Sequence, residues 1–432
     1  MSNISLLTAA LLLSSLPAHA GMFDNASKPE MKSGPVELHP YLKLSEMYDS
    51  NIFLQPRSGV KGNNANGNSA GPVLGSWIHT VNAGLKAGLT LSEMHRLDLG
   101  YDMAYKAYKK DPRSNNTVNQ TADAMYTYKG PMGITGHLKD SYLNTVDPAT
   151  SELAGGERKR RWQNTAGLDV EYAPEGGALM FGVDGNETVH KYVTKDAALR
   201  ALNRYEQLIG FKAGYHVMPK TRVFAAYHRQ VVHYTNHPAV PTSNSKSHML
   251  EGGIEGDIAP KLTGQIQSGL QYRKYDDTPI GKNDRSKITR NWVVSTKLVY
   301  RPLERTKVDL MLSRSLQEST FQGNPFYIAT AAGLNVMHKF PWKVTAGVNA
   351  AVEQDKYPQT VPVSLGAAPS IGTIRVNRRD EIYQTGGNLD YDIQEWLKVG
   401  VSYLYRVRFS HNLSDQYNYR DHQTGMSVGV MF

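Results

Sequence analysis

Charged side chains that recur at every second position could line a water-filled path. Within residues 96–108, Asp98, Asp102 and Lys106 lie on one face of a period-two pattern, and leucine, tyrosine and methionine fill the other face. Residues 397–409 repeat the pattern, with Arg406 and Arg408 on the polar face. This pattern is typical of a strand with lipid on one side and water on the other. The residues predicted to line the water-filled path are Lys43, Lys86, Asp98, Asp102, Lys106, Lys212, Glu255, Arg273, Lys297, Asp390, Arg406 and Arg408.

The sequence gives little support for catalysis or metal binding. There is no HExxH, Walker, GxSxG or EF-hand pattern. In the richest histidine stretch, His228 and His233 are five positions apart and fall on opposite faces of a strand, and His237 falls in an expected loop. The chain has no cysteine, which excludes disulfides and thiolate metal ligands. We therefore predict no catalytic residue, no metal site and no cofactor.

The elements that position the charged side chains are predicted to be long β-strands. The period-two runs extend over about ten to fourteen residues, which suits tilted strands that cross hydrocarbon. Short connections alternate with long polar ones, and the short ones carry six prolines that recur every 39 to 45 residues. The sequence predicts an all-β fold, a transmembrane antiparallel β-barrel of about 18 strands (16 to 20), with short periplasmic turns and longer extracellular loops.

Aromatic residues support a membrane location. Many tyrosines and tryptophans lie near predicted strand ends, where amphipathic rings suit the headgroup level of a bilayer. These are Trp77, Tyr108, Tyr126, Tyr128, Tyr172, Tyr215, Tyr272, Tyr300, Trp342 and Trp396. The uncharged run from Val361 to Ile374 contains proline and glycine and is expected to be a loop.

The chain divides into three predicted parts. Residues 1–20 read as a signal peptide, with an apolar run followed by Pro17 and the pattern Ala18-His19-Ala20. Residues 21–35 are expected to form a short periplasmic segment, and residues 36–432 a single barrel domain. The last predicted strand ends on Phe432, which shares the apolar face; an aromatic there resembles the insertion signal of bacterial outer-membrane proteins. The predicted location is the outer membrane of a Gram-negative bacterium.

One short motif gives more specific information than the alternation of the strands. Tyr48, Asp49, Asn51, Ile52 and Phe53 lie in the stretch YDSNIF at the end of the first predicted strand. The stretch resembles the first-strand motif of the putative β-barrel porin 2 family, whose members recur with exopolysaccharide synthesis and export systems. Physically, the aspartate and asparagine can cap the turn that ends the strand, while the isoleucine and phenylalanine pack the start of the loop.

The resemblance implies an outer-membrane channel that exports an exopolysaccharide or capsular polysaccharide. The charged lumen equally fits a general diffusion porin for small hydrophilic solutes, and a third hypothesis is an enzyme or adhesin on a barrel platform. Strand direction predicts acidic residues in the periplasmic half of the lumen and basic residues toward the mouth. A basic extracellular rim is predicted at Arg158, Lys159, Arg160 and Arg161.

The expected partners follow from that location. They are outer-membrane lipid and lipopolysaccharide, the barrel-insertion machinery, and periplasmic components of a polysaccharide synthesis or export system. No nucleic acid is expected.

Overall fold

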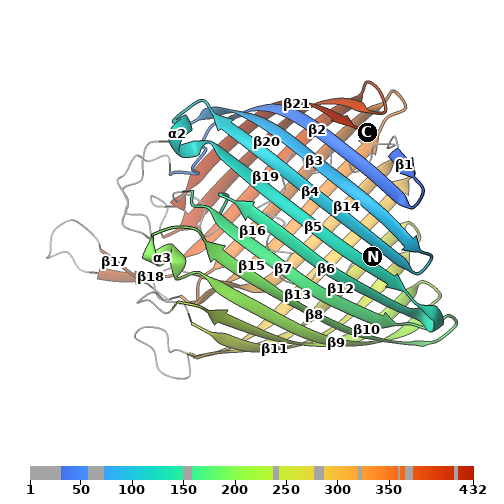
Figure 1. Cartoon of the computed structure of the whole chain (residues 1–432). Coiled ribbons are helices and arrows are strands. Elements are labelled where there is room, and N and C mark those ends of the chain that lie inside the picture. The colour runs from blue at the N-terminus through green and yellow to red at the C-terminus, as the bar shows by residue number, and fades with distance from the viewer. Residues whose placement is uncertain are drawn as a thin grey trace.

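The computed structural model describes residues 31–56, 73–148, 158–236, 243–276, 287–319, 324–358, 361–364, 373–412 and 417–432. In these residues, eighteen antiparallel strands follow one another around a closed barrel, and Figure 1 shows their strong tilt. The barrel closes where the first strand pairs with the last, from Tyr41 opposite Met431 to Asp49 opposite Gln423. The predicted fold class and strand number are therefore confirmed.

The barrel strands alternate in direction along the chain. They are β2 (Val36–Asp49), β3 (Ser76–Ser92), β4 (His95–Tyr108), β5 (Thr117–Lys129), β6 (Ile134–Thr145), β7 (Arg161–Tyr172), β8 (Leu179–Tyr192), β9 (Arg204–Met218), β10 (Thr221–Tyr234), β11 (Ser245–Ala259), β12 (Leu262–Tyr275), β13 (Ile288–Leu303), β14 (Thr306–Glu318), β15 (Phe326–Lys339), β16 (Val344–Lys356), β19 (Arg379–Asp392), β20 (Leu397–His411) and β21 (Tyr419–Met431).

Smaller elements lie at the two ends of the barrel. A short strand β1 (Met31–Ser33) pairs with the beginning of β2. The helices α2 (Pro112–Asn115) and α3 (Ala197–Arg200) lie at the opposite end, together with a hairpin of β17 (Val361–Ser364) and β18 (Thr373–Val376) (Figure 1). The expectation of loop structure from Val361 to Ile374 is thus wrong at both ends of that run, because those residues pair as a two-stranded sheet. The predicted signal peptide, residues 1–20, lies outside the described residues.

The short connections gather at one end of the barrel and the long ones at the other, as predicted. The tight turns use left-handed backbone at Met132, Lys261 and Lys343 (φ 61°, 64° and 64°). Gly133 is required in the turn after β5, because a Cβ on it would lie 2.2 Å from the carbonyl oxygen of Ala173. No helix among the described residues is long and apolar enough to cross a membrane.

The outer surface of the barrel is apolar over its middle and aromatic near its edges. Leucine, valine and phenylalanine side chains point outward and are exposed, such as Leu270 and Phe211. Nine of the ten predicted aromatic residues follow this outward pattern. Tyr108 is the exception: it is 4% exposed and packs inside against Ile52 and Ile78. The period-two pattern places Tyr108 on the charged face with Lys106, so its ring points inward although it lies at the end of β4.

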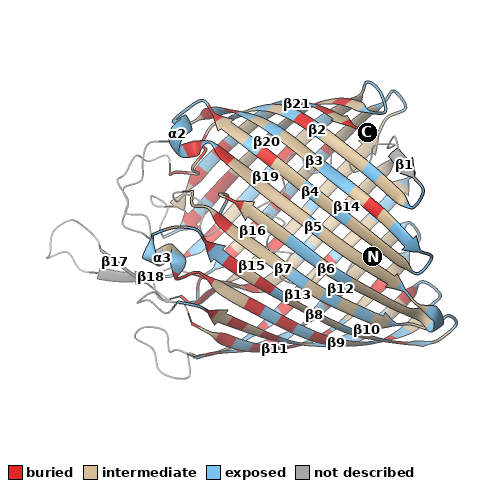
Figure 2. Ribbon diagram, viewed as in Figure 1, coloured by how far each residue is buried: buried red, intermediate tan, exposed pale blue. Residues whose placement is uncertain are grey.

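Buried residues are not spread evenly along the barrel axis. Figure 2 shows them concentrated toward the end that carries the long loops. Inward side chains there are packed against one another, whereas several inward side chains nearer the other end remain exposed. The lumen therefore has two zones, one in which inward side chains are packed against one another and one in which they are exposed to water.

Candidate transport pathway

The lumen face carries all twelve residues that the sequence assigned to it. In each strand the assigned residue lies on the face opposite the exposed apolar side chains, as the strand registers require. Direct contacts across the inner face agree: Tyr41 Oη donates to Asp102 Oδ2 at 2.6 Å, and Arg406 Nε donates to Gln384 Oε1 at 3.2 Å. These side chains therefore face inward in the structure. Whether they touch a transported molecule remains a prediction.

The middle and periplasmic part of the lumen is accessible to water. Lys86, Asp123 and Lys297 face inward yet are exposed. Charged neighbours there form close pairs, within one strand or between strands, rather than zones of one sign. These pairs are Lys212–Glu255 (2.5 Å), Arg222–Glu171 (2.6 Å), Lys139–Asp169 (2.5 Å), Arg96–Asp98 (2.8 Å) and Lys398–Asp392 (3.2 Å). The predicted acidic periplasmic half is thus largely neutralised by basic partners.

The extracellular end of the lumen is held by a buried network centred on Glu318, the Glu318 network. Arg273 Nη2 lies 2.6 Å from Glu318 Oε1, and Tyr234 Oη donates to Glu318 Oε2 at 2.9 Å. The rings of Tyr275 and Phe326 stack with centroids 5.6 Å apart and planes 6° apart. The network connects strands β10, β12, β14 and β15 across the inside of the barrel.

The Glu318 network forms because the upper β14–β15 hairpin (residues 315–319 and 324–328) leaves the barrel wall. The ladder between β13 and β14 ends at Val294 opposite Arg314, although both strands continue toward the extracellular side. The pairing of β14 with β15 continues to Glu318 opposite Phe326. Beyond Arg314, the face of β14 that pointed outward packs against the inward residues of β12. The hairpin therefore folds into the lumen behind β12 and β13.

A second buried network, the Asp380 network, lies at the same end of the barrel, where β19 begins and β20 ends. Arg378 Nη2 donates to Asp380 Oδ2 at 2.6 Å, and Ser410 Oγ donates to Asp380 Oδ1 at 2.7 Å. Arg408 Nε lies 3.9 Å from the same carboxylate. Burial disfavours the charged guanidinium of Arg378, but the neighbouring Tyr357 and Asp380 outweigh this and raise its pKa. The predicted lumen residue Arg408 is therefore part of a packed structure and is not free in the pore.

The first-strand motif builds an inward turn at the end of β2. Asp49 Oδ1 accepts a hydrogen bond from the backbone N–H of Asn51 at 2.8 Å. The Asn51 side chain donates to the carbonyl oxygens of Gln55 (2.9 Å) and Arg420 (3.1 Å), which ties the loop to β21. Ile52 packs against Ile78 and Tyr108, with Phe53 beside them. The contacts agree with the structural role predicted for the motif, and they lie at the closing seam of the barrel.

The basic run at residues 158–161 does not form an exposed rim. Arg161 is 4% exposed and donates to the carbonyl oxygen of Asp147. Arg158 donates to Tyr108 Oη and to the carbonyl oxygen of Ile52. Arg160 Nη1 donates to the Val118 carbonyl oxygen at 2.9 Å, and Lys159 is half-buried. The rim prediction is wrong for the buried Arg161, and Arg158 and Arg160 turn toward backbone carbonyls, which charge counting along the chain cannot reveal.

Asp147 belongs to the same loop contact. Its carboxylate lies 3.5 Å from Lys106 Nζ and accepts hydrogen bonds from Thr145 and Asn119. Burial favours the neutral acid, but Lys106 and Arg158 outweigh it and hold the pKa of Asp147 below its usual value. The predicted lumen residue Lys106 is therefore tied to the loop after β6.

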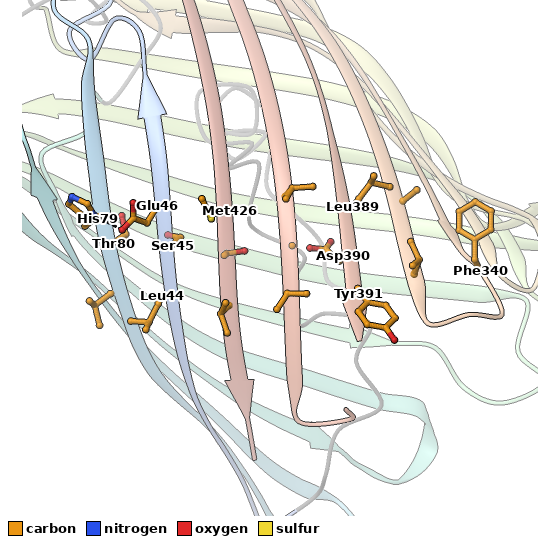
Figure 3. A pocket seen from close by; sticks show the side chains of 18 of the residues that line it. Leu44, Ser45, Glu46, His79, Thr80, Phe340, Leu389, Asp390, Tyr391 and Met426 are labelled. Carbon is orange, nitrogen blue, oxygen red and sulfur yellow. Dashed lines mark hydrogen bonds and ion pairs between the residues drawn. The ribbon is translucent and has the colours of Figure 1, made fainter. Parts of the chain in front are cut away.

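An apolar groove lies on the outside of the barrel, over the closing seam. Figure 3 shows its lining, with Leu44 and Met426 on the seam strands and Phe340 on the far side. Glu46 and His79 lie at one edge, where His79 Nδ1 is 2.9 Å from Glu46 Oε1. Because these side chains point away from the lumen, the groove belongs to the lipid-facing surface and not to the transport pathway.

Sequence reasoning missed the residues that form the buried networks of the extracellular end. Glu318 gave no signal, because the alternation that places Leu312 outside also assigns Glu318 to the outer face. Arg378 and Asp380 lie two apart, a spacing that would have allowed an ion pair on one strand face. Because the two residues lie next to a long loop, the sequence does not assign them to a strand face.

A closed barrel with an apolar exterior, an aromatic edge and a charged interior defines a β-barrel of the bacterial outer membrane. The chain belongs to the family described as Putative beta-barrel porin 2, which it matches over residues 38–432. It is therefore a multi-pass outer-membrane protein of a porin or channel family.

Solved structures with a similar fold are distant. The outer membrane protein opdK from Pseudomonas aeruginosa is 11% identical, with 91% of this chain and 98% of that chain covered and a TM-score of 0.42. The siderophore receptor PirA from Acinetobacter baumannii is 9% identical, with 91% and 80% covered and a TM-score of 0.42. The ferric citrate transporter FecA is 9% identical, with 91% and 78% covered and a TM-score of 0.44. No protein of curated function matches the chain.

Proposed function

We propose that the barrel is an outer-membrane channel for export of a polysaccharide, with a water-filled vestibule on the periplasmic side and a gated extracellular mouth. The observation that carries the proposal is the uneven lumen: inward charged side chains are exposed near one end and packed into buried networks at the other. A channel that is always open needs no such packing. A channel for a polymer benefits from closure between transport events.

The inner face toward the extracellular end carries buried amides and hydroxyls, which would suit a cargo rich in hydroxyl groups once that end opens. Inward amides and hydroxyls of β10, β11 and β12 are hydrogen-bonded across strands: Gln271 Nε2 donates to Ser247 Oγ (3.2 Å), and Ser247 Oγ donates to Gln230 Oε1 (3.4 Å). Such groups both donate and accept, as sugar hydroxyls do. The association of the family with exopolysaccharide systems, which the first-strand motif implies, supports the same cargo.

Passive diffusion of small hydrophilic solutes is the second candidate. The paired charges of the vestibule, such as Lys212 with Glu255, favour it because they leave no zone of a single sign to select a polymer. An eighteen-strand barrel is also wide enough for a water-filled channel. The packed extracellular end counts against a permanently open form of this channel. Catalysis on the barrel platform has no comparable support.

A deletion strain separates these functions. We expect loss of surface polysaccharide with unchanged uptake of small sugars and ions, and recovery of the polymer when the wild-type gene is restored. Reduced uptake with normal surface polysaccharide would replace export by diffusion as the function. If neither quantity changes, both channel functions are wrong. Co-purification of periplasmic polysaccharide-synthesis proteins would test the predicted partners.

A further inference from the structure

The outward carboxylates of the barrel have close partners. Glu46 is 2.9 Å from His79, and Glu381 is 2.6 Å from Arg379. Glu187 accepts a hydrogen bond from Gln207 at 2.6 Å, and Asp140 accepts one from Asn164 at 3.0 Å. Such pairing is expected on a surface beside lipid, where an isolated charge is costly.

Four outward cations on neighbouring strands depart from this pattern. Arg229, Lys246, Lys274 and Arg290 lie on β10, β11, β12 and β13, and their side chains are exposed on the outer face. We call them the basic belt. Within the described residues, the outward positions of these four strands carry no carboxylate, and no ion pair is formed by any of the four. The belt therefore offers its charge to a partner outside the barrel.

The strand registers bring these cations together. Lys246 lies directly opposite Lys274. Lys274 in turn faces Ile288 on β13, and Arg290 is the next outward residue along that strand. Like charges directly opposite each other on a sheet are destabilising unless an anion lies between them. On the β10 side, Arg229 faces His248, whose Nδ1 is 2.6 Å from Tyr227 Oη. The arrangement is that of an anion site left open on one side.

The belt lies at the level of the extracellular headgroups. Arg290 faces Tyr272, and its Cζ lies 5.9 Å from the centre of that ring. Trp292 is the next outward residue on β13 and is also exposed. Below these rings the surface is apolar, with Leu250 and Leu270 among its most exposed side chains. A molecule that fits this surface has phosphate-like charge at the headgroup level and acyl chains beneath it.

We infer that the basic belt binds the phosphate groups of lipid A, the anionic glycolipid part of lipopolysaccharide in the outer leaflet. The lipid A acyl chains then cover the apolar surface below the belt. Free phosphate would make no use of that surface, and a neutral lipid would leave the cations uncompensated. The inference rests on the membrane location of the barrel and not on the proposed cargo. It gives the predicted lipopolysaccharide partner a site on the outside of β10–β13.

The test compares two triple variants of the full chain, purified folded in detergent. One removes belt charges (Lys246→Gln, Lys274→Gln and Arg290→Gln). The matched control removes three other outward cations of the extracellular end (Lys191→Gln, Arg379→Gln and Arg420→Gln). Native mass spectrometry measures the binding of diphosphorylated lipid A, of dephosphorylated lipid A and of inorganic phosphate.

We expect the belt variant to bind diphosphorylated lipid A on the order of 100-fold more weakly than wild type, since each cation near an anionic surface contributes roughly fivefold. The control should bind like wild type, and dephosphorylated lipid A should bind both proteins equally weakly. Equal lipid A binding by the belt variant and the control would overturn the site. Stronger binding of inorganic phosphate than of lipid A would also overturn it.

Folding of the belt variant can be checked independently. Without lipid, the double variant Lys246→Gln with Lys274→Gln should unfold at the same or a higher temperature than wild type, because it removes a like-charge contact. Diphosphorylated lipid A should raise the unfolding temperature of wild type and leave that of the double variant nearly unchanged. An equal rise in both proteins would contradict the proposal.

Discussion

Removal of the Glu318 carboxylate should open the extracellular end of the barrel. In Glu318→Gln the side chain keeps its size, but Arg273 loses its ionic partner and Tyr234 loses a charged acceptor. The side chains of Arg273 and Glu318 are 3% and 9% exposed, so solvent screens their interaction weakly. Loss of one partner from a buried ion pair costs about 3–5 kcal/mol. The cost falls on the packed state, in which the hairpin lies inside the lumen.

The energetic cost of losing this ion pair predicts a large change in channel opening. A loss of about 3 kcal/mol shifts an equilibrium between packed and released hairpin by roughly 150-fold. Single-channel recording in planar bilayers should show rare, short openings for wild type and frequent or sustained openings for Glu318→Gln. Asp123→Asn is a suitable control, because it removes an equal lumen charge where the side chain is exposed and distant from the mouth.

If Glu318→Gln conducts like wild type while a folding assay shows an intact barrel, the β14–β15 hairpin does not limit conduction. If Asp123→Asn raises conduction as strongly, the effect comes from lumen charge in general and not from the Glu318 network. The exchange variant Arg273→Glu with Glu318→Arg should restore part of the wild-type closure, because opposite charges again face each other.

Three further outcomes follow from the structure. Arg406→Glu should shift the reversal potential in asymmetric salt toward cation selectivity, and an unchanged potential would place this side chain outside the conducting path. Asp147, whose pKa is lowered beside Lys106, stabilises its loop fully above about pH 4, its usual unfolded value, and loses that contribution as the pH falls through the lower folded value. Protection of the loop amides, measured by hydrogen exchange relative to the intrinsic rate at each pH, should fall on acidification in wild type and be low already at pH 7 in Asp147→Asn. Phe432→Ser removes a ring stacked 6.1 Å from that of Trp396. It should reduce the amount of barrel inserted in cells strongly and the unfolding temperature of the inserted barrel only slightly, and equal surface levels of the variant and wild type would refute this.

The sequence allowed the wall of the barrel to be predicted almost completely. A strand that separates lipid from water must alternate, so the alternation of Asp98 and Asp102 with leucine and tyrosine reports both the element and its orientation. The same rule placed Arg406 inside and gave the number of strands. These features are local, because each depends only on residues two apart.

The interior of the mouth could not be predicted in this way. Glu318 reaches Arg273 because β14 leaves β13 beyond Arg314, and nothing in the alternation marks that departure. The sequence assigns Arg161 to an exposed run of charge, yet it is buried against the carbonyl oxygen of Asp147. Both outcomes depend on residues that are distant in sequence and meet only when the barrel closes.

One strand joins the mouth to the membrane. On β12, Tyr272 and Lys274 point outward beside the basic belt, while Arg273 between them points inward to Glu318. In a period-two element, a force that fixes the outer side chains also fixes the residue between them, because all three share one backbone. Lipid A held by the belt would therefore stiffen the segment that positions the arginine of the Glu318 network. Single-channel recording of wild type in bilayers with and without lipopolysaccharide measures this coupling. If closure depends on the Glu318 network alone, the channel should open equally often in both bilayers.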